Sequence, residues 1–183
     1  MAQKQDVTVN LARLLSNDPH AEGEVEAQGE FTPLPEWHSA DYSIEQPLGY
    51  DIQVRAVGDY EFLLSGSVSG QAMTPCRRCL KPVAVEGRSD FIYPMEYSQG
   101  VEELSIRRDE DDEEVLVFGQ PQVDFAILLA EVFSVDLPIT AACADANECQ
   151  DLVAAYGTDQ DNDRGGRSAF ASLKDLDLGS QKE

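Results

Sequence analysis

In the middle of the chain, hydrophobic and polar residues alternate with the two-residue period of half-buried β-strands. One such strand is predicted at residues 50–54, and the turn Gly58-Asp59 separates it from a second strand that runs from residue 60 toward Cys76. Residues 83–95 are predicted to form a further long strand or a hairpin arm. Because short links join consecutive strands, the pattern predicts an antiparallel sheet with one face in solvent.

Other segments are predicted to flank this sheet. Residues 7–16 have the spacing of a short strand that leads into one or two helical turns. Val115–Phe118 is a short apolar strand that returns to the sheet, and residues 123–135 have the spacing of a mostly buried helix, which Leu137-Pro138 ends. The single tryptophan, Trp37, lies in a proline-containing connection, and we expect it at the edge of the core.

These elements predict an α+β fold, with an antiparallel, partly barrel-like β-sheet formed mainly by residues 49–118 and a few short covering helices. Residues 1–157 are predicted to form a single β-rich domain. Within it, the six consecutive acidic residues at 109–114 repel one another and favour a solvated loop. Residues 158–183 are predicted to be a polar linker followed by a short C-terminal helix at 168–174.

The net charge of the chain limits the classes of partner that it is expected to bind. The 183 residues include 35 Asp and Glu against 13 Lys and Arg, which gives a net charge of −22. Such a chain lacks the surplus of lysine and arginine that neutralises phosphates, so binding to nucleic acid or to an anionic membrane is disfavoured. A partner with a basic surface is favoured instead. No apolar run is long enough to span a membrane, and the first residues lack a signal-peptide pattern. We therefore expect a soluble cytoplasmic protein.

Catalytic patterns are scarce. The two histidines, His20 and His38, lie in polar stretches next to prolines, where a general base is not expected. The chain has no nucleophile elbow, phosphate-binding loop or dinucleotide fingerprint. We therefore predict a protein that is not an enzyme and that has no small-molecule substrate.

The four cysteines allow three interpretations. Cys76-Arg-Arg-Cys79 has the spacing that lets two thiolates converge on one ion, and Cys143 and Cys149 could complete a four-sulfur structural Zn²⁺ site. Five residues separate Cys143 from Cys149, however, which is wider than usual, so thiols packed at the end of a strand are the favoured interpretation and no cofactor is assigned. A redox-active pair is the third interpretation, but it needs a helix that starts at the motif, and none is predicted.

A small group of basic residues accompanies the first cysteine pair. Arg77, Arg78, Lys81 and Arg88 are predicted to form a local basic cluster in an otherwise acidic chain. Arg77 and Arg78 would help to lower the thiol pKa values, and the whole cluster is a candidate contact for RNA or for a protein partner.

Several motifs together resemble the YceD family of large ribosomal RNA subunit accumulation proteins. They are Gly66-Ser-Val-Ser-Gly70, Cys76-Arg-Arg-Cys-Leu-Lys-Pro-Val83, Phe91 with Tyr93, Val123-Asp-Phe125 with Leu128, Glu131 and Leu137-Pro138, and Phe170-Ala-Ser-Leu-Lys174. The resemblance implies a bacterial cytoplasmic, non-enzymatic factor for 23S rRNA accumulation and 50S subunit assembly. Many relatives carry several close cysteines downstream, where this chain has only Cys143 and Cys149.

The resemblance and the charge together lead to two hypotheses from different classes. In the first, the chain is a ribosome biogenesis factor that binds a basic ribosomal protein or a basic assembly factor, with at most a limited contact to 23S rRNA. In the alternative, it is a zinc-binding or thiol-redox protein whose function resides in Cys76, Cys79, Cys143 and Cys149.

Overall fold

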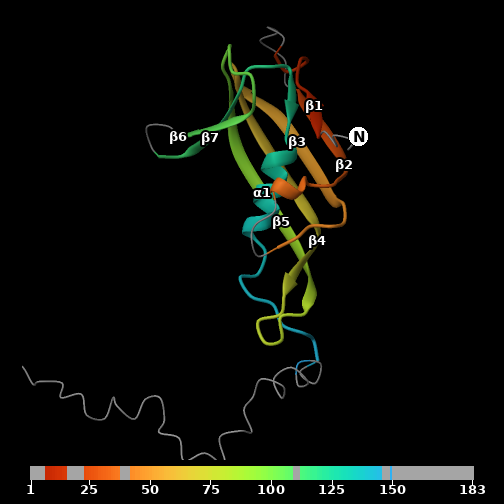
Figure 1. Cartoon of the computed structure of the whole chain (residues 1–183). Helices are drawn as coiled ribbons and strands as arrows, with labels where there is room; N and C mark the ends of the chain where they lie inside the picture. Colours follow the sequence, from red (N-terminus) through yellow and green to blue (C-terminus); the bar gives the residue numbers. More distant parts are fainter. Residues whose placement is uncertain (1–6, 16–22, 38–41, 109–111, 146–148, 150–183) are drawn as a thin grey trace, which may run out of the picture. The chain divides into compact units, whose positions relative to one another are not determined.

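The computed structural model describes residues 7–15, 23–37, 42–108, 112–145 and 149 (Figure 1). Residues 1–142 form one compact unit, to which the following description applies, and the residues from Cys143 onward belong to a second. The first unit is built on a six-stranded sheet with the strand order β2-β3-β4-β5-β7-β6. Its strands are β2 (Glu24–Phe31), β3 (Leu48–Gly58), β4 (Glu61–Pro75), β5 (Pro82–Tyr97), β6 (Ser105–Arg108) and β7 (Glu114–Phe118).

Three smaller elements complete the unit. A two-stranded antiparallel sheet pairs β1 (Thr8–Asn10) with β8 (Gln122–Asp124). Within the described residues, α1 (Ala126–Val135) is the one α-helix, and η1 (Pro35–Trp37) is a single 3₁₀ turn. Neither helix is both long and apolar enough to cross a membrane. The turn after β1 and the partly buried Trp37 against the core confirm the sequence predictions for these segments.

The β4–β5 hairpin is the longest feature of the fold. β3 accompanies β4 only as far as the pair Gly49 and Ser69, and beyond it β4 and β5 continue together to the pair Pro75 and Pro82. Two isolated bridges are the other ladder contacts to this arm among the described residues, one from Ser43 to Met73 of β4 and one from Ala141 to Cys76, just after β4 ends. Figure 1 shows the arm extending past the rest of the sheet, so the turn at its tip stands apart from the main core.

The predicted strand periodicity is confirmed in β4 and β5. Buried positions alternate along β4 on the face that α1 covers, and Cys76 comes next in the same alternation. On β5 the even-numbered residues from 82 to 94 are exposed, so this part of the sheet has one face in solvent, as predicted. The buried residues of this alternation in β4 are Phe62, Leu64, Val68, Ala72 and Thr74.

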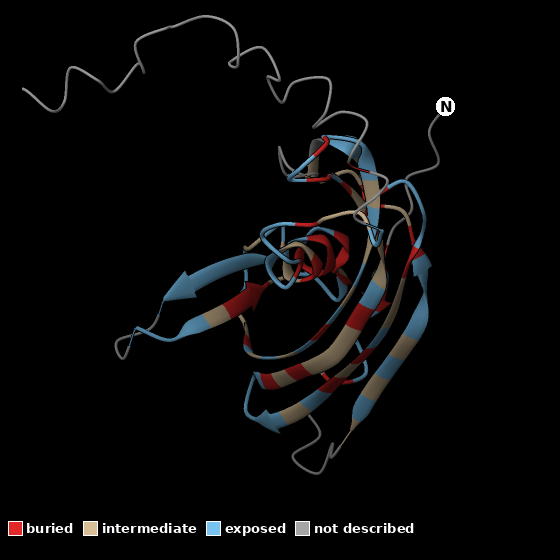
Figure 2. Ribbon diagram, turned by 90° about the horizontal axis from the view of Figure 1, so that it is seen from below, coloured by how far each residue is buried: buried red, intermediate tan, exposed pale blue. Residues whose placement is uncertain are grey.

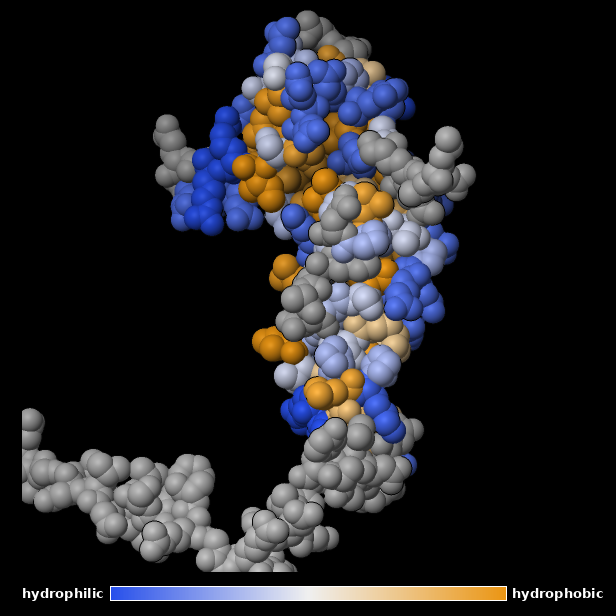
Figure 3. Space-filling view, viewed as in Figure 1, coloured by the Kyte–Doolittle hydropathy of each residue, from blue (hydrophilic) through white to orange (hydrophobic). Residues whose placement is uncertain are grey.

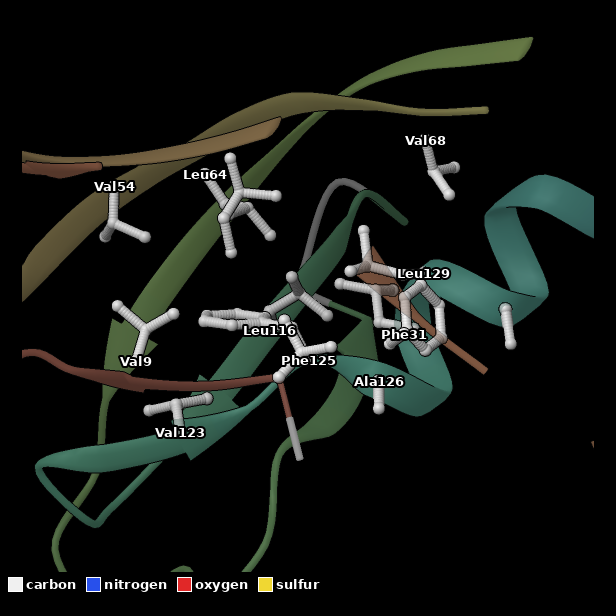
Figure 4. Packing of buried hydrophobic residues seen from close by; sticks show 14 of the residues in the cluster. Val9, Phe31, Val54, Leu64, Val68, Leu116, Val123, Phe125, Ala126 and Leu129 are labelled. Carbon is white, nitrogen blue, oxygen red and sulfur yellow. The ribbon is translucent and has the colours of Figure 1, made fainter. Parts of the chain in front are cut away.

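The hydrophobic core lies between the concave face of the sheet and α1. Figure 2 shows the sheet curving around the helix, with buried residues lining the inside. In Figure 4, Leu64 and Val68 of β4 point toward side chains of α1, β7 and β8. Phe133 of α1 is fully buried, and its ring would lie 2.9 Å from a Cβ atom at position 87. The missing side chain of Gly87 is therefore what lets α1 approach β5 so closely.

Three details of the structure differ from the predicted fold. The sheet curves but is not closed into a barrel, because β2 and β6 are its two edges and do not pair, so the barrel-like part of the prediction is not confirmed. A helix about 10 Å wide occupies the concave side, and a small closed barrel has room only for side chains there. The sheet is also not wholly antiparallel, since β5 and β7 run parallel. The helix begins at Ala126 and not at residue 123, because Gln122–Asp124 pairs with β1.

Parts of the sequence prediction lie outside the described residues. They include the proposed domain boundary at residue 157, the linker and C-terminal helix within 158–183, both histidines, and the first half of the acidic run at 109–111. The described half of that run begins with Asp112, whose carboxylate pairs with Arg108, and it ends with Glu114 as the first residue of β7. Of the few covering helices that were predicted, the described residues contain α1 and the short η1.

Candidate metal centre

The turn at the tip of the β4–β5 arm positions the first two cysteines. Cys76 and Cys79 are both buried, although the residues between them are exposed. The N–H of Cys76 donates to the carbonyl of Lys81 at 2.8 Å, and the N–H of Leu80 donates to the carbonyl of Cys76 at 2.8 Å. These two bonds close a tight turn that directs both sulfur atoms inward.

Leu80 shows that this turn is held under strain. Its φ angle is 60°, in the left-handed region that a residue with a branched side chain rarely adopts, and its side chain is exposed. Such a conformation costs about 1–3 kcal/mol and persists where the surroundings hold it in place. The N–H of Arg78 also donates to the Cys76 sulfur at 3.4 Å.

The other two cysteines follow a segment that is tied to the same turn. Ala141 forms a parallel bridge with Cys76, and the N–H of Arg77 donates to the Ala141 carbonyl at 2.9 Å. The Sγ atoms of Cys76, Cys79, Cys143 and Cys149 all lie within 4.8 Å of one another, and none of the four, all of which are described, forms a disulfide. Four thiolates around Zn²⁺, at Zn–S distances of about 2.3 Å, have sulfurs about 3.8 Å apart. The donor set therefore suits a tetrahedral Zn²⁺ site.

The arrangement around Cys76 and Cys79 is unlike that of a redox-active pair. The two residues lie in a turn between two strands, and no helix of the described chain starts at the motif. A low-pKa nucleophilic cysteine is usually accessible and often sits at a helix N-terminus, whereas Cys76 is fully buried. The geometry therefore fits metal binding or simple packing better than thiol exchange.

The structure brings together only part of the predicted basic cluster. Arg77, Arg78 and Lys81 are exposed in the turn that holds the cysteines. Arg88 pairs in register with Ser69, six residues along β5 from Pro82, which is roughly 20 Å at about 3.3 Å per residue. It lies on the outer face of the sheet, where its guanidinium contacts Asp90 at 3.2 Å. The local positive charge at the cysteines thus comes from Arg77, Arg78 and Lys81.

A second feature, which was not predicted from the sequence, is a groove of about 570 Å³. Residues of η1, of β6 and β7, and of the segment from β8 into α1 line it, so no continuous motif encodes it. Figure 3 shows apolar side chains gathered on this face above the arm, with hydrophilic side chains around them. The side chains that define the groove are Leu34, Trp37, Ile106, Leu116, Ile127 and Leu128.

Burial and two nearby carboxylates shift the pKa of one tyrosine, Tyr93. Burial raises the pKa of Tyr93 above its ordinary value of 10.0, and the carboxylates of Glu114 and Glu131 raise it further. Both causes oppose the phenolate, because it is a charged group and because it would face like charges.

We predict that this tyrosine contributes to the stability of the chain in alkali. At pH values above 10 the unfolded chain loses the Tyr93 proton while the folded chain keeps it, so this contribution is complete below pH 10 and falls as the pH rises through the folded pKa. Tyr93→Phe should therefore make the decline in unfolding free energy above pH 10 shallower, and it should remove a step above pH 10 from the tyrosine absorbance titration. Identical declines in the two proteins would contradict this prediction.

Comparison with known proteins agrees with the resemblance drawn from the motifs. The family model described as large ribosomal RNA subunit accumulation protein YceD matches residues 64–177. This match includes β4 from Leu64 onward, the cysteine turn, α1 and all four cysteines. Searches of curated proteins and of solved structures each returned no match. Since the matched segment is more than half of the chain, the chain belongs to the YceD family.

Proposed function

We propose that this chain is a non-enzymatic factor that supports accumulation of the 23S rRNA and assembly of the large ribosomal subunit. The observation that carries the proposal is the family match over residues 64–177, because the description of the family names accumulation of the large ribosomal RNA subunit. The functional part of the chain would then include the β4–β5 arm and α1, which both lie inside the matched segment.

We further propose that the chain acts by binding a basic protein of the assembling particle. The net charge of −22 supports a basic partner, because opposite fields speed association and like charges repel the rRNA backbone. The arginines of β6 do not reverse this balance, since Arg107 pairs with Glu96 and Arg108 with Asp112 and Glu114. A limited RNA contact would fall to Arg77, Arg78 and Lys81 at the exposed turn.

Affinity capture at two salt concentrations tests this proposal. At low salt the purified chain should retain a basic ribosomal protein or assembly factor, and raising the salt should weaken the association by about tenfold or more, because the attraction is screened. Cells without the chain should also contain fewer mature large subunits. Retention of naked 23S rRNA alone, with no protein intermediary, would contradict the proposed mechanism, and normal large-subunit abundance would contradict the proposed role.

A second candidate function, structural zinc binding, is favoured by one observation, which is the proximity of the four cysteine sulfurs. The ion would hold the turn at the tip of the arm, and Arg77, Arg78 and Lys81 would offset the net negative charge of a four-thiolate zinc site. Zinc would supply no catalysis there, because four protein ligands leave no open coordination position.

Zinc analysis and subunit profiles together separate the two candidates. A stoichiometric metal combined with normal subunit assembly in the absence of the chain would favour a metal protein unrelated to ribosomes. A stoichiometric metal combined with reduced large subunits would instead mean that zinc serves the ribosomal role.

A further inference from the structure

The groove between α1, η1 and the β6–β7 pair has an apolar floor that is open to solvent. Leu116, Phe118 and Val123 form buried parts of its lining. Ile106 on β6 and Ile127 on α1 also line it, and they are 50% and 52% exposed. Large aliphatic side chains left half exposed in one hollow differ from scattered surface residues, because they can be covered by one ligand.

All of the charged residues that line the groove are acidic. They are Glu102, Glu103, Asp124 and Glu131, and no lysine or arginine is among the lining residues. Asp124 already has a structural role, because its carboxylate accepts a hydrogen bond from the N–H of Ala126 at the start of α1. For the other three, no ion pair is formed with any residue of the described part of the chain. The apolar hollow thus has a rim of negative charge.

We propose that this groove is the docking site for a segment of a partner protein that combines apolar anchors with lysine or arginine. The proposal rests on the proposed function and deepens it, because it assigns the basic partner to a defined surface. Apolar side chains of the segment would cover Ile106 and Ile127, and its cations would face Glu102, Glu103 and Glu131. A volume of about 570 Å³ accommodates a few such side chains and not a folded domain.

Charge complementarity selects this occupant over the alternatives. An RNA backbone or an anionic lipid surface would bring phosphates against several carboxylates, which repel them. A second copy of this chain would bring another net charge of −22, which the acidic rim repels. A cationic segment gains from both halves of the groove, since burial of its apolar side chains and attraction to the rim act in the same place.

Trp37 provides a direct measurement, because it lines the groove and is the single tryptophan of the chain. The probe is a twelve-residue peptide of leucine and lysine without aromatic residues, titrated into the full chain at low salt while tryptophan emission and binding heat are followed. We expect saturable binding with a change in Trp37 emission. A peptide of the same pattern with glutamate in place of lysine should not bind.

Substitutions on one helix locate the binding. Ile127→Gln should weaken binding of the basic peptide by about tenfold, because it removes an apolar anchor from the groove. Val135→Gln is the matched control, since Val135 is also an exposed aliphatic residue of α1 and does not line the groove. Glu102→Gln with Glu103→Gln should weaken binding at low salt and reduce its salt dependence. Ile127 and Val135 are both more than half exposed, so neither substitution should change the thermal unfolding temperature. This temperature is measured for each variant alongside binding.

Several results would overturn this docking site. One is an equal loss of basic-peptide binding in Ile127→Gln and Val135→Gln, and another is comparable binding of the acidic peptide. The others are preferential binding of single-stranded RNA and self-association of the chain that Ile127→Gln abolishes. Failure of the proposed function is separable from failure of the groove. Normal large-subunit abundance without the chain would remove the ribosomal role while groove binding persists, whereas reduced abundance without peptide binding would remove only the groove.

Discussion

If the four cysteines hold zinc as proposed, replacing Cys76 by serine is expected to remove the metal from the chain and to lower its unfolding temperature. Cys76 is fully buried, and its sulfur lies within 4.8 Å of the other three cysteine sulfurs. With one ligand gone a tetrahedral thiolate site loses most of its affinity, and the binding energy that the folded state gains from the metal goes with it. At a metal concentration of about 1,000 times the dissociation constant, that gain is about 4 kcal/mol.

Zinc content and unfolding with and without a chelator provide the measurement. The chelator should destabilise the wild-type chain and leave Cys76→Ser unchanged, since the variant has no metal to lose. Arg78→Ala is the matched control, because Arg78 is exposed and its backbone N–H, which donates to the Cys76 sulfur, is retained. A wild-type chain that folds equally well without zinc would instead support packed thiols at the strand end.

Phe133→Ala is expected to cost about 3–5 kcal/mol of unfolding free energy, which is the usual range for truncating a buried aromatic residue. Phe133 is fully buried on α1, and its ring fills the space left by the absent side chain of Gly87 on β5. The loss should be large because the long, regular β5 cannot collapse into the cavity. A cost of this size is a substantial share of the stability of an ordinary domain.

Urea unfolding of matched variants tests this expectation. Val135→Ala changes the same helix two residues later, at a side chain that is 82% exposed, and it should alter the unfolding free energy by no more than about 0.5 kcal/mol. Equal effects of the two substitutions would mean that α1 does not pack on the sheet in the way described.

The sequence identified the four cysteines as a candidate ligand set. It did not show whether their sulfur atoms lie close together. Cys76 and Cys79 are close because two residues separate them in a tight turn, which is a local property. The proximity of Cys143 depends on the bridge between Ala141 and Cys76, which joins segments 65 residues apart. Spacing alone therefore favoured packed thiols, because the wide gap between Cys143 and Cys149 carried no information about that bridge.

The groove had no comparable signal in the sequence. Ile106 belongs to β6, a four-residue strand whose side chains are all exposed and which has no hydrophobic alternation to reveal it. Ile127 falls within a helix that is apolar nearly all round, so its exposure cannot be read from helical spacing. Trp37 was expected at the edge of the core, and the structure adds that it borders an open hollow there.

Local alternation was enough to specify β3, β4 and β5 and the solvent face of β5, because side chains of neighbouring residues point to opposite faces of a strand. Composition alone set the charge that favours a basic partner. Contacts between distant segments decided the rest: the pairing of β1 with β8 that delays the helix to Ala126, the parallel alignment of β7 with β5, and the open edges of the sheet. Strands of three to five residues carry too little periodicity to identify their partners, so these pairings depend on how the whole unit buries its apolar surface.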